Sequence, residues 1–111
     1  MKRTPMKKIN TQRRARERER AYGPPERRKW ISELPCSVPG CGLGPSENAH
    51  VSPENEPSGM GRKGDYQYVI PLCHHHHQEL HNSGQRTFND TYRIDVALIA
   101  VHTQATWLEA A

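Results

Sequence analysis

The sequence is poor in the residues that build a large apolar interior. Of its 111 residues, 33% are hydrophobic, 6% are aromatic and one is Phe. A chain of this length forms one domain at most, and a domain with so small a core commonly needs a structural metal or disulfides. No apolar run has the length of a membrane span, so no association with a membrane is expected.

Cysteine is also scarce, and its number is odd. Three cysteines cannot all pair with one another, and the chain contains no recognisable signal peptide. Both observations favour zinc ligation in the reducing cytoplasm over a disulfide framework. We therefore expect a cytoplasmic protein whose cysteines bind a metal.

Charge is distributed unevenly along the chain. Residues 1–30 carry a net charge of +9 and residues 31–111 carry −5, within a formal total of +4. A basic arm before a mildly acidic, histidine-rich domain points to nucleic acid as the partner. The alternative is a disordered, solubilising tail. We expect an arm over residues 1–29, disordered or ordered by DNA, and a folded domain over residues 30–111.

The arm contains a segment that can form a helix. Thr11 can cap a helix from Gln12 to Ala21 that is polar all round, so packing would not hold it and docking on phosphates is what we expect to order it. Gly23-Pro24-Pro25 ends this helix, and a second one runs from Glu26 to Glu33. The expected phosphate-binding residues of this region are Arg13, Arg14, Arg16, Arg18, Arg20, Arg27, Arg28 and Lys29.

The stretch from Asp65 to Gly84 has the densest set of metal-binding side chains. Its alternating start, Tyr66 to Ile70, predicts a strand that Pro71 ends, and the following segment predicts a helix from Cys73 to Gly84. Residues three and four apart share a helix face. The pair Cys73 and His76 and the pair His77 and His81 therefore lie side by side. A histidine tag and a solvated histidine-rich face are the alternatives, and the two upstream cysteines favour metal binding over both.

Those upstream cysteines form a Cys-x4-Cys turn in a segment rich in Pro and Gly. The turn can aim the thiolates of Cys36 and Cys41 at one ion, although this spacing alone is weak evidence. Together with Cys73 and His76 it completes a Cys3His set, which is strong evidence for structural zinc.

A strand over Asn48–Val51 is expected between the two halves of this set, followed by a loop. In that loop, glycines allow a close backbone approach to a phosphate that Arg62 and Lys63 can neutralise. A plain flexible loop is an equally good interpretation.

The C-terminal part of the chain reads as helical. We expect a short helix from Gln85 to Tyr92 and a second from Val96 to Leu108 that Asp95 caps. Apolar residues at helical spacing predict the buried face. The expected core residues are Ile94, Ala97, Leu98, Val101, Ala105 and Leu108, with Phe88 and Trp107.

This order of elements resembles the HNH (ββα-metal) endonucleases, and more closely the phage recombination-enhancement (Ref-like) type. The resemblance implies an α+β fold: a small zinc-stabilised ββα-metal core with flanking helices and a basic N-terminal arm. It covers Cys36–Gly84 firmly and the helices after it loosely. The residues that carry it are Ala49-His50-Val51, Gly59 to Asp65, and Ile70-Pro71-Leu72-Cys73-x2-His76-His77-x3-His81.

The resemblance also implies residue roles. His50 matches the strand histidine that activates water, and His77 and His81 match the helix histidines that hold a catalytic divalent ion, Mg²⁺ or Mn²⁺. The chain departs from the family where many members have Asp or His, here Ala49, and where many have Asn, here Tyr68. By the same resemblance, Asp65 supplies the missing carboxylate.

The implied activity is metal-dependent hydrolysis of DNA phosphodiester bonds, linked to recombination or DNA processing in a bacteriophage. Single-stranded, duplex and branched DNA all remain candidate substrates. Two alternatives stay open. One is a non-catalytic zinc module that binds DNA, and the other is an accessory protein that acts on a recombination complex such as a recombinase filament.

Overall fold

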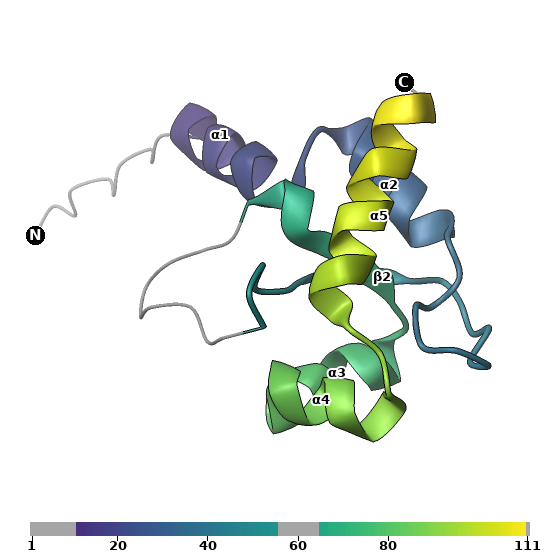
Figure 1. Cartoon of the computed structure of the whole chain (residues 1–111). Coiled ribbons are helices and arrows are strands. Elements are labelled where there is room, and N and C mark those ends of the chain that lie inside the picture. The colour runs from purple at the N-terminus through teal and green to yellow at the C-terminus, as the bar shows by residue number, and fades with distance from the viewer. Residues whose placement is uncertain (1–10, 56–64, 111) are drawn as a thin grey trace, which may run out of the picture.

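A small antiparallel sheet, β1 paired with β2, lies among five α-helices in the computed structural model, which describes residues 11–55 and 65–110 (Figure 1). The helices α3 and α4 lie together below the sheet in this view, and α5 crosses in front of it. None of the described helices has the length and apolarity needed to span a bilayer. The elements are α1 (Thr11–Tyr22), α2 (Pro25–Glu33), β1 (Glu47–His50), the 3-10 helix η1 (Tyr66–Tyr68), β2 (Val69–Leu72), α3 (His74–Ser83), α4 (Gln85–Tyr92) and α5 (Val96–Ala110).

The second strand differs from the prediction. Residues 66–68 form η1, and the strand begins only at Val69 and continues through Pro71, opposite Asn48. Pro71 is tolerated because both strands of a two-stranded sheet are edges, where a missing N–H donor costs little. Its carbonyl accepts hydrogen bonds from Ser37 N at 2.9 Å and Ser37 Oγ at 2.7 Å. Through this carbonyl, Pro71 holds the cysteine-bearing loop against β2.

The helix predicted after this strand is confirmed, together with its end. Cys73 is the N-cap of α3 and Gly84 is the C-cap, with its N–H bonded to Leu80 O at 3.0 Å. Gly84 has φ +88°, a conformation that favours glycine because a Cβ would be strained there. The same residue precedes α4, so one glycine turns the chain between the two helices.

The last helix is capped as predicted, and Ala97 is buried as predicted, but the rest of the expected apolar stripe within this helix is exposed. Asp95 Oδ1 accepts from the N–H groups of Ala97 at 3.0 Å and Leu98 at 3.2 Å. However, the exposed fractions of Leu98, Val101 and Leu108 are 52%, 56% and 62%. The buried residues of α5 are Val96, Ala97 and Ala100.

The hydrophobic core lies where the sheet, the cysteine-bearing loop and the C-terminal helices meet. Phe88 is fully buried, which confirms its predicted place in the core. Half-buried Trp107 pairs with Trp30 of α2, with ring centroids 5.3 Å apart. The central cluster consists of Cys36, Val38, Ala49, Val51, Ile70, Leu72, Cys73, Leu80, Phe88, Val96 and Ala100.

The helices of the basic region join the fold earlier than the predicted boundary at residue 30. Ala21 and Arg27 are buried, whereas every residue from 11 to 20 is exposed. Gly23 has φ +88°, and a Cβ built on it would lie 3.2 Å from both the Arg27 side chain and the Tyr66 ring. A glycine is therefore needed where α1 meets α2 and η1.

Candidate metal centre and the residues around it

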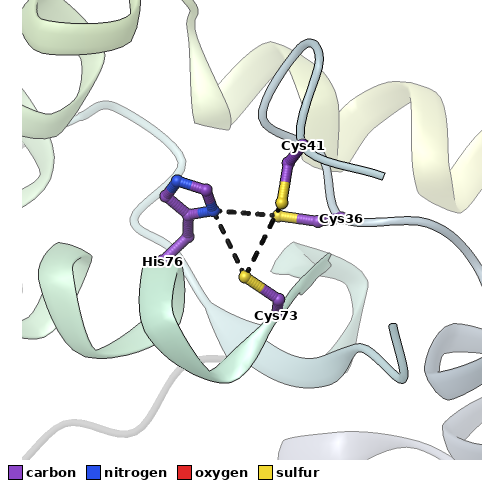
Figure 2. Close-up of side chains that lie close together, drawn as sticks. All are labelled: Cys36, Cys41, Cys73 and His76. Atoms are coloured by element: carbon purple, nitrogen blue, oxygen red, sulfur yellow. Dashed lines mark hydrogen bonds between the residues drawn. The ribbon is translucent and has the colours of Figure 1, made fainter. Parts of the chain in front are cut away.

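Four predicted zinc ligands, Cys36, Cys41, Cys73 and His76, converge on one point (Figure 2). Their ligand atoms all lie within 4.8 Å of one another. Cys41 Sγ lies 3.8 Å from Cys73 Sγ, and His76 Nδ1 lies 3.2 Å from Cys73 Sγ and 3.4 Å from Cys36 Sγ. Zn–S and Zn–N bonds of about 2.3 Å and 2.0 Å in a tetrahedron place two sulfurs about 3.8 Å apart, and a sulfur and a nitrogen about 3.5 Å apart. The cluster therefore fits a tetrahedral zinc ion.

Local structure explains why the ligands meet. Cys73 is the N-cap of α3 and His76 lies one turn later, so this pair is placed by a single helix start. The other pair sits on the loop between α2 and β1, which folds back through the hydrogen bond from Cys41 N to Val38 O at 3.1 Å. All three cysteines are free thiols. The site thus joins two segments that are more than thirty residues apart in sequence.

The thiols differ in how readily they ionise. Burial raises the pKa of Cys36 to about 11. This effect is larger than the opposite effect of the backbone N–H groups near its sulfur, which lower the pKa. Burial also opposes ionisation of Cys73, but the backbone N–H groups of His76 and His75 and two thiol hydrogen bonds outweigh it, so the pKa of Cys73 is lowered. A thiolate at a helix N-terminus is stabilised in this way. Cys73 therefore ionises more readily than Cys36, which favours metal binding at the start of α3.

The His76 ring is held by neighbours on its outer side. Tyr92 and Phe88 contact it edge-on, with ring centroids 5.1 Å and 6.4 Å away. Glu79 accepts a short hydrogen bond from the Tyr92 hydroxyl, and this bond raises the pKa of Tyr92 to about 12. Side chains that support a ligand are part of a metal site because they fix the orientation of the ring.

The predicted catalytic histidines do not all come together. His50 faces α1: its Nε2 makes a short hydrogen bond with Ala21 O, and the Tyr22 ring lies 4.5 Å from its own. His77 and His81 are neighbours on α3, with ring centroids 6.4 Å apart. Within residues 11–55 and 65–110, no group of three ligands within 4.8 Å contains His50, His77, His81 or the exposed Asp65.

The alternation of β1 explains this separation. Asn48 and His50 point to one face of the strand, where Asn48 Nδ2 donates to Arg28 O of α2 at 3.3 Å. Glu47 and Ala49 point to the other face, toward α3. The side chain that meets His77 is thus Glu47, whose Oε1 accepts from His77 Nδ1 at 2.7 Å. The prediction overlooked Glu47, although its spacing of three from His50 places it on the opposite strand face.

The basic residues fall into two groups. In α1, Arg13, Arg14, Arg16, Arg18 and Arg20 are exposed, and Arg13 pairs with Glu17 at 3.2 Å. In α2, Lys29 is exposed and Arg28 is half-buried. Arg62 and Lys63 lie outside the described residues.

Arg27 lies in the interior, contrary to the prediction that it binds nucleic acid. Its side chain is fully buried, because Arg27 shares the inner face of α2 with Ile31 one turn later. Its Nη2 donates to Gln104 Oε1 at 2.9 Å, and its guanidinium lies over the Tyr66 ring, 5.3 Å from the centroid. Nε and Nη1 have no partner. Arg27 is therefore an internal contact between α2 and α5 and is not available to phosphates.

Comparison with known proteins places the chain in a family. A family model described as "Protein of unknown function (DUF968)" matches residues 5–107. The chain belongs to the DUF968 family. This DUF968 chain is also 35% identical over 83 residues to the "Uncharacterized protein YdfU" of Escherichia coli strain K12. The match covers 68% of this chain and 23% of that protein, so the DUF968 chain spans less than a quarter of its relative's length. No solved structure matches it.

Proposed function

We propose that this protein is a zinc-stabilised, metal-dependent DNA endonuclease with a ββα-metal core. The observation that carries the proposal is the succession of β1, β2 and α3 around the Cys3His cluster. The hairpin runs directly into the helix through Cys73, which is both the N-cap of α3 and a member of the Cys3His cluster that could hold a metal ion. This order of elements supports the proposal, in which the site combines His50 at the end of β1 with the histidines of α3.

In this proposal, His77 and His81 hold Mg²⁺ or Mn²⁺, since histidines four residues apart on a helix can share one ion. A divalent ion supplies charge stabilisation for the phosphate and for the leaving oxygen. His50, as a neutral imidazole, takes the proton from the attacking water. The exposed arginines of α1 neutralise DNA phosphates. The zinc thiolates need a reducing environment, which suits the cytoplasm.

The position of His50 imposes a condition on this mechanism. Its ring is engaged by Ala21 and Tyr22 at the end of α1. The residues before them in α1, from 11 to 20, are all exposed, so this helix is held to the domain mainly by its last turn. Catalysis by His50 therefore requires that DNA draw the end of α1 away from it and bring its ring round to His77 and His81, because His50 lies on the face of β1 opposite to α3.

The test is cleavage of single-stranded, duplex and branched DNA with Mg²⁺ or Mn²⁺. His50→Ala should lower the rate by about 10²–10⁴-fold, the usual contribution of a general base. Zinc content and DNA affinity should stay unchanged. His102→Ala is the matched control, because His102 is exposed on α5. Cleavage by His50→Ala at the parent rate would remove His50 from the mechanism.

A second candidate is a non-catalytic zinc module that binds DNA, alone or within a recombination complex. The observation that favours it is the same contact of His50 with α1, which leaves His50 apart from His77 and His81. Salt-dependent DNA binding without cleavage under any metal would support this candidate. If a recombinase filament restored cleavage, the accessory form of the nuclease would be supported instead.

A further inference from the structure

Glu47 bridges two histidines of α3. Its Oε1 accepts a hydrogen bond from His77 Nδ1 at 2.7 Å, and its Oε2 accepts one from His74 Nδ1 at 2.9 Å. The two donors are three residues apart, so they share a helix face that also includes His81, four residues beyond His77. One carboxylate from the strand therefore holds the near end of a stripe of three histidines.

The two contacts of Glu47 have the distances of ordinary hydrogen bonds. Within the described residues, Glu47, His74 and His77 do not form a group whose ligand atoms all lie within 4.8 Å. Each ring thus uses Nδ1 as its donor to Glu47. A neutral imidazole has one N–H and one lone pair, so the lone pair is then on Nε2. Glu47 decides which nitrogen of each ring is free to bind a ligand.

We propose that Glu47 is the positioning carboxylate of the candidate divalent-metal site, a role distinct from the direct ligation that the family resemblance implies for Asp65. Glu47 accepts the hydrogen bond from His77 Nδ1, so that His77 Nε2 is left to face the ion. The hydrogen bond from His74 to the other oxygen of Glu47 fixes the orientation of the carboxylate. Ligating histidines commonly donate their second nitrogen to a carboxylate in this way, which fixes the tautomer and makes the ring a better ligand. The inference rests on the proposed function, because that proposal makes His77 a metal ligand.

The packing of β1 against α3 explains why Glu47, and no other carboxylate named above, takes this positioning role. Its neighbour in the alternation, Ala49, is fully buried in the core cluster that also contains Leu80 of α3, so the strand face carrying Glu47 is fixed against that helix. Asp65, by contrast, is exposed at the N-cap of η1. The carboxylate that the fold brings to His77 is thus Glu47.

The test uses the full chain with one zinc in its Cys3His cluster, and Mn²⁺ as the probe. Nitrogen NMR of the imidazole rings should show His77 with its proton on Nδ1 at a pH where the ring is neutral. Glu47→Ala should abolish this preference and weaken Mn²⁺ binding by about 10–100-fold in calorimetry. His74→Ala should weaken binding less, because it leaves the hydrogen bond of Glu47 to His77 intact.

Two variants keep the result interpretable. Glu47→Gln preserves the shape and one acceptor oxygen, so it should fold with normal zinc content and show an intermediate loss of Mn²⁺ affinity. Glu109→Gln removes the same charge from an exposed position on α5 and should change nothing. If Glu47→Gln and Glu47→Ala left the His77 tautomer and the Mn²⁺ affinity at parent values, the inference would be wrong. A Mn²⁺ affinity of His77→Ala equal to that of the parent would also overturn the inference.

The failure of this inference can be told from failure of the nuclease proposal. A protein that binds Mn²⁺ through His77 in a Glu47-dependent way, yet leaves every DNA form intact, supports the positioning role and contradicts the nuclease. Cleavage that depends on His50 but not on Glu47 does the reverse.

Discussion

Removing the metal from the Cys3His cluster should unfold this domain. The cluster ties the loop between α2 and β1 to the start of α3, and two of its ligands, Cys36 and Cys73, belong to the central hydrophobic cluster. Structural zinc of this type contributes about 10–16 kcal/mol at neutral pH. The whole net stability of an ordinary domain is about 5–15 kcal/mol. The free energy lost with the zinc ion therefore equals or exceeds the net stability that the small core can supply.

The sharpest form of the experiment compares two adjacent histidines. His76→Ala removes one of the four ligands, whereas His75→Ala removes an exposed ring of similar size one residue away. The first variant should bind less than one zinc per chain and lose its helical circular dichroism at 25 °C. The second should keep one zinc per chain and unfold within a few degrees of the parent, since about 1 kcal/mol shifts the melting temperature of such a domain by roughly 4–8 °C.

Acid should release the metal for a related reason. Zinc needs deprotonated thiols, and burial raises the pKa of Cys36 to about 11, so zinc binding must displace its proton. Zinc affinity should rise with pH, and binding in weakly buffered solution should release protons. A chelator-treated protein with full circular dichroism, an unchanged melting temperature and no zinc would refute the claim that the metal holds the fold together.

Four further results are expected. Deleting residues 1–22 should flatten the dependence of DNA affinity on the logarithm of salt concentration in binding titrations, and an unchanged slope would make the arm a solubilising tail. Arg27→Met should leave DNA affinity unchanged and keep or raise the melting temperature, because it removes a buried charge whose donors are only partly paired. Asp95→Ala should cost about 0.5–2 kcal/mol in denaturant unfolding at neutral pH by removing a helix cap. Because hydrogen bonds, first that from the Asn55 side chain, lower the pKa of Asp95, its stabilisation should be present above the ordinary carboxyl pKa and disappear as the pH falls through the lowered one, so that the variant and the parent converge in strong acid. Leu98→Lys should change stability by less than about 0.5 kcal/mol, as exposed substitutions usually do, and a large loss would place Leu98 in the core.

Local signals in the sequence were sufficient for several elements. Gly84 ends α3, Asp95 caps α5, and the spacing of Cys73 and His76 gives two candidate metal ligands on one helical turn. Each of these features depends on residues within about one turn of each other, so neighbouring residues carry the information. For the same reason, the helix predicted from Gln85 to Tyr92 has the same first and last residues in the structure.

The face that α5 buries was not readable from its sequence. Two apolar stripes run along this helix, one through Val96 and Ala100 and the other through Leu98 and Val101. Both have helical spacing, so periodicity could not choose between them. The core at β2 takes the stripe with smaller side chains, which lets the helix lie close to the strand. Arg27 shows the same limit, because its burial depends on where α5 crosses α2.

The sequence by itself indicated the four candidate metal ligands, the order of two strands and a helix, and the basic character of α1, because each of these depends on residue type and short spacing. Only the tertiary structure decided which histidines share a face of the fold. A strand sends alternate side chains to opposite sides, and the register of β1 on β2 fixes Ala49 in the core. That one constraint turns Glu47 toward His77 and His50 toward α1, and no local pattern in the chain specifies it.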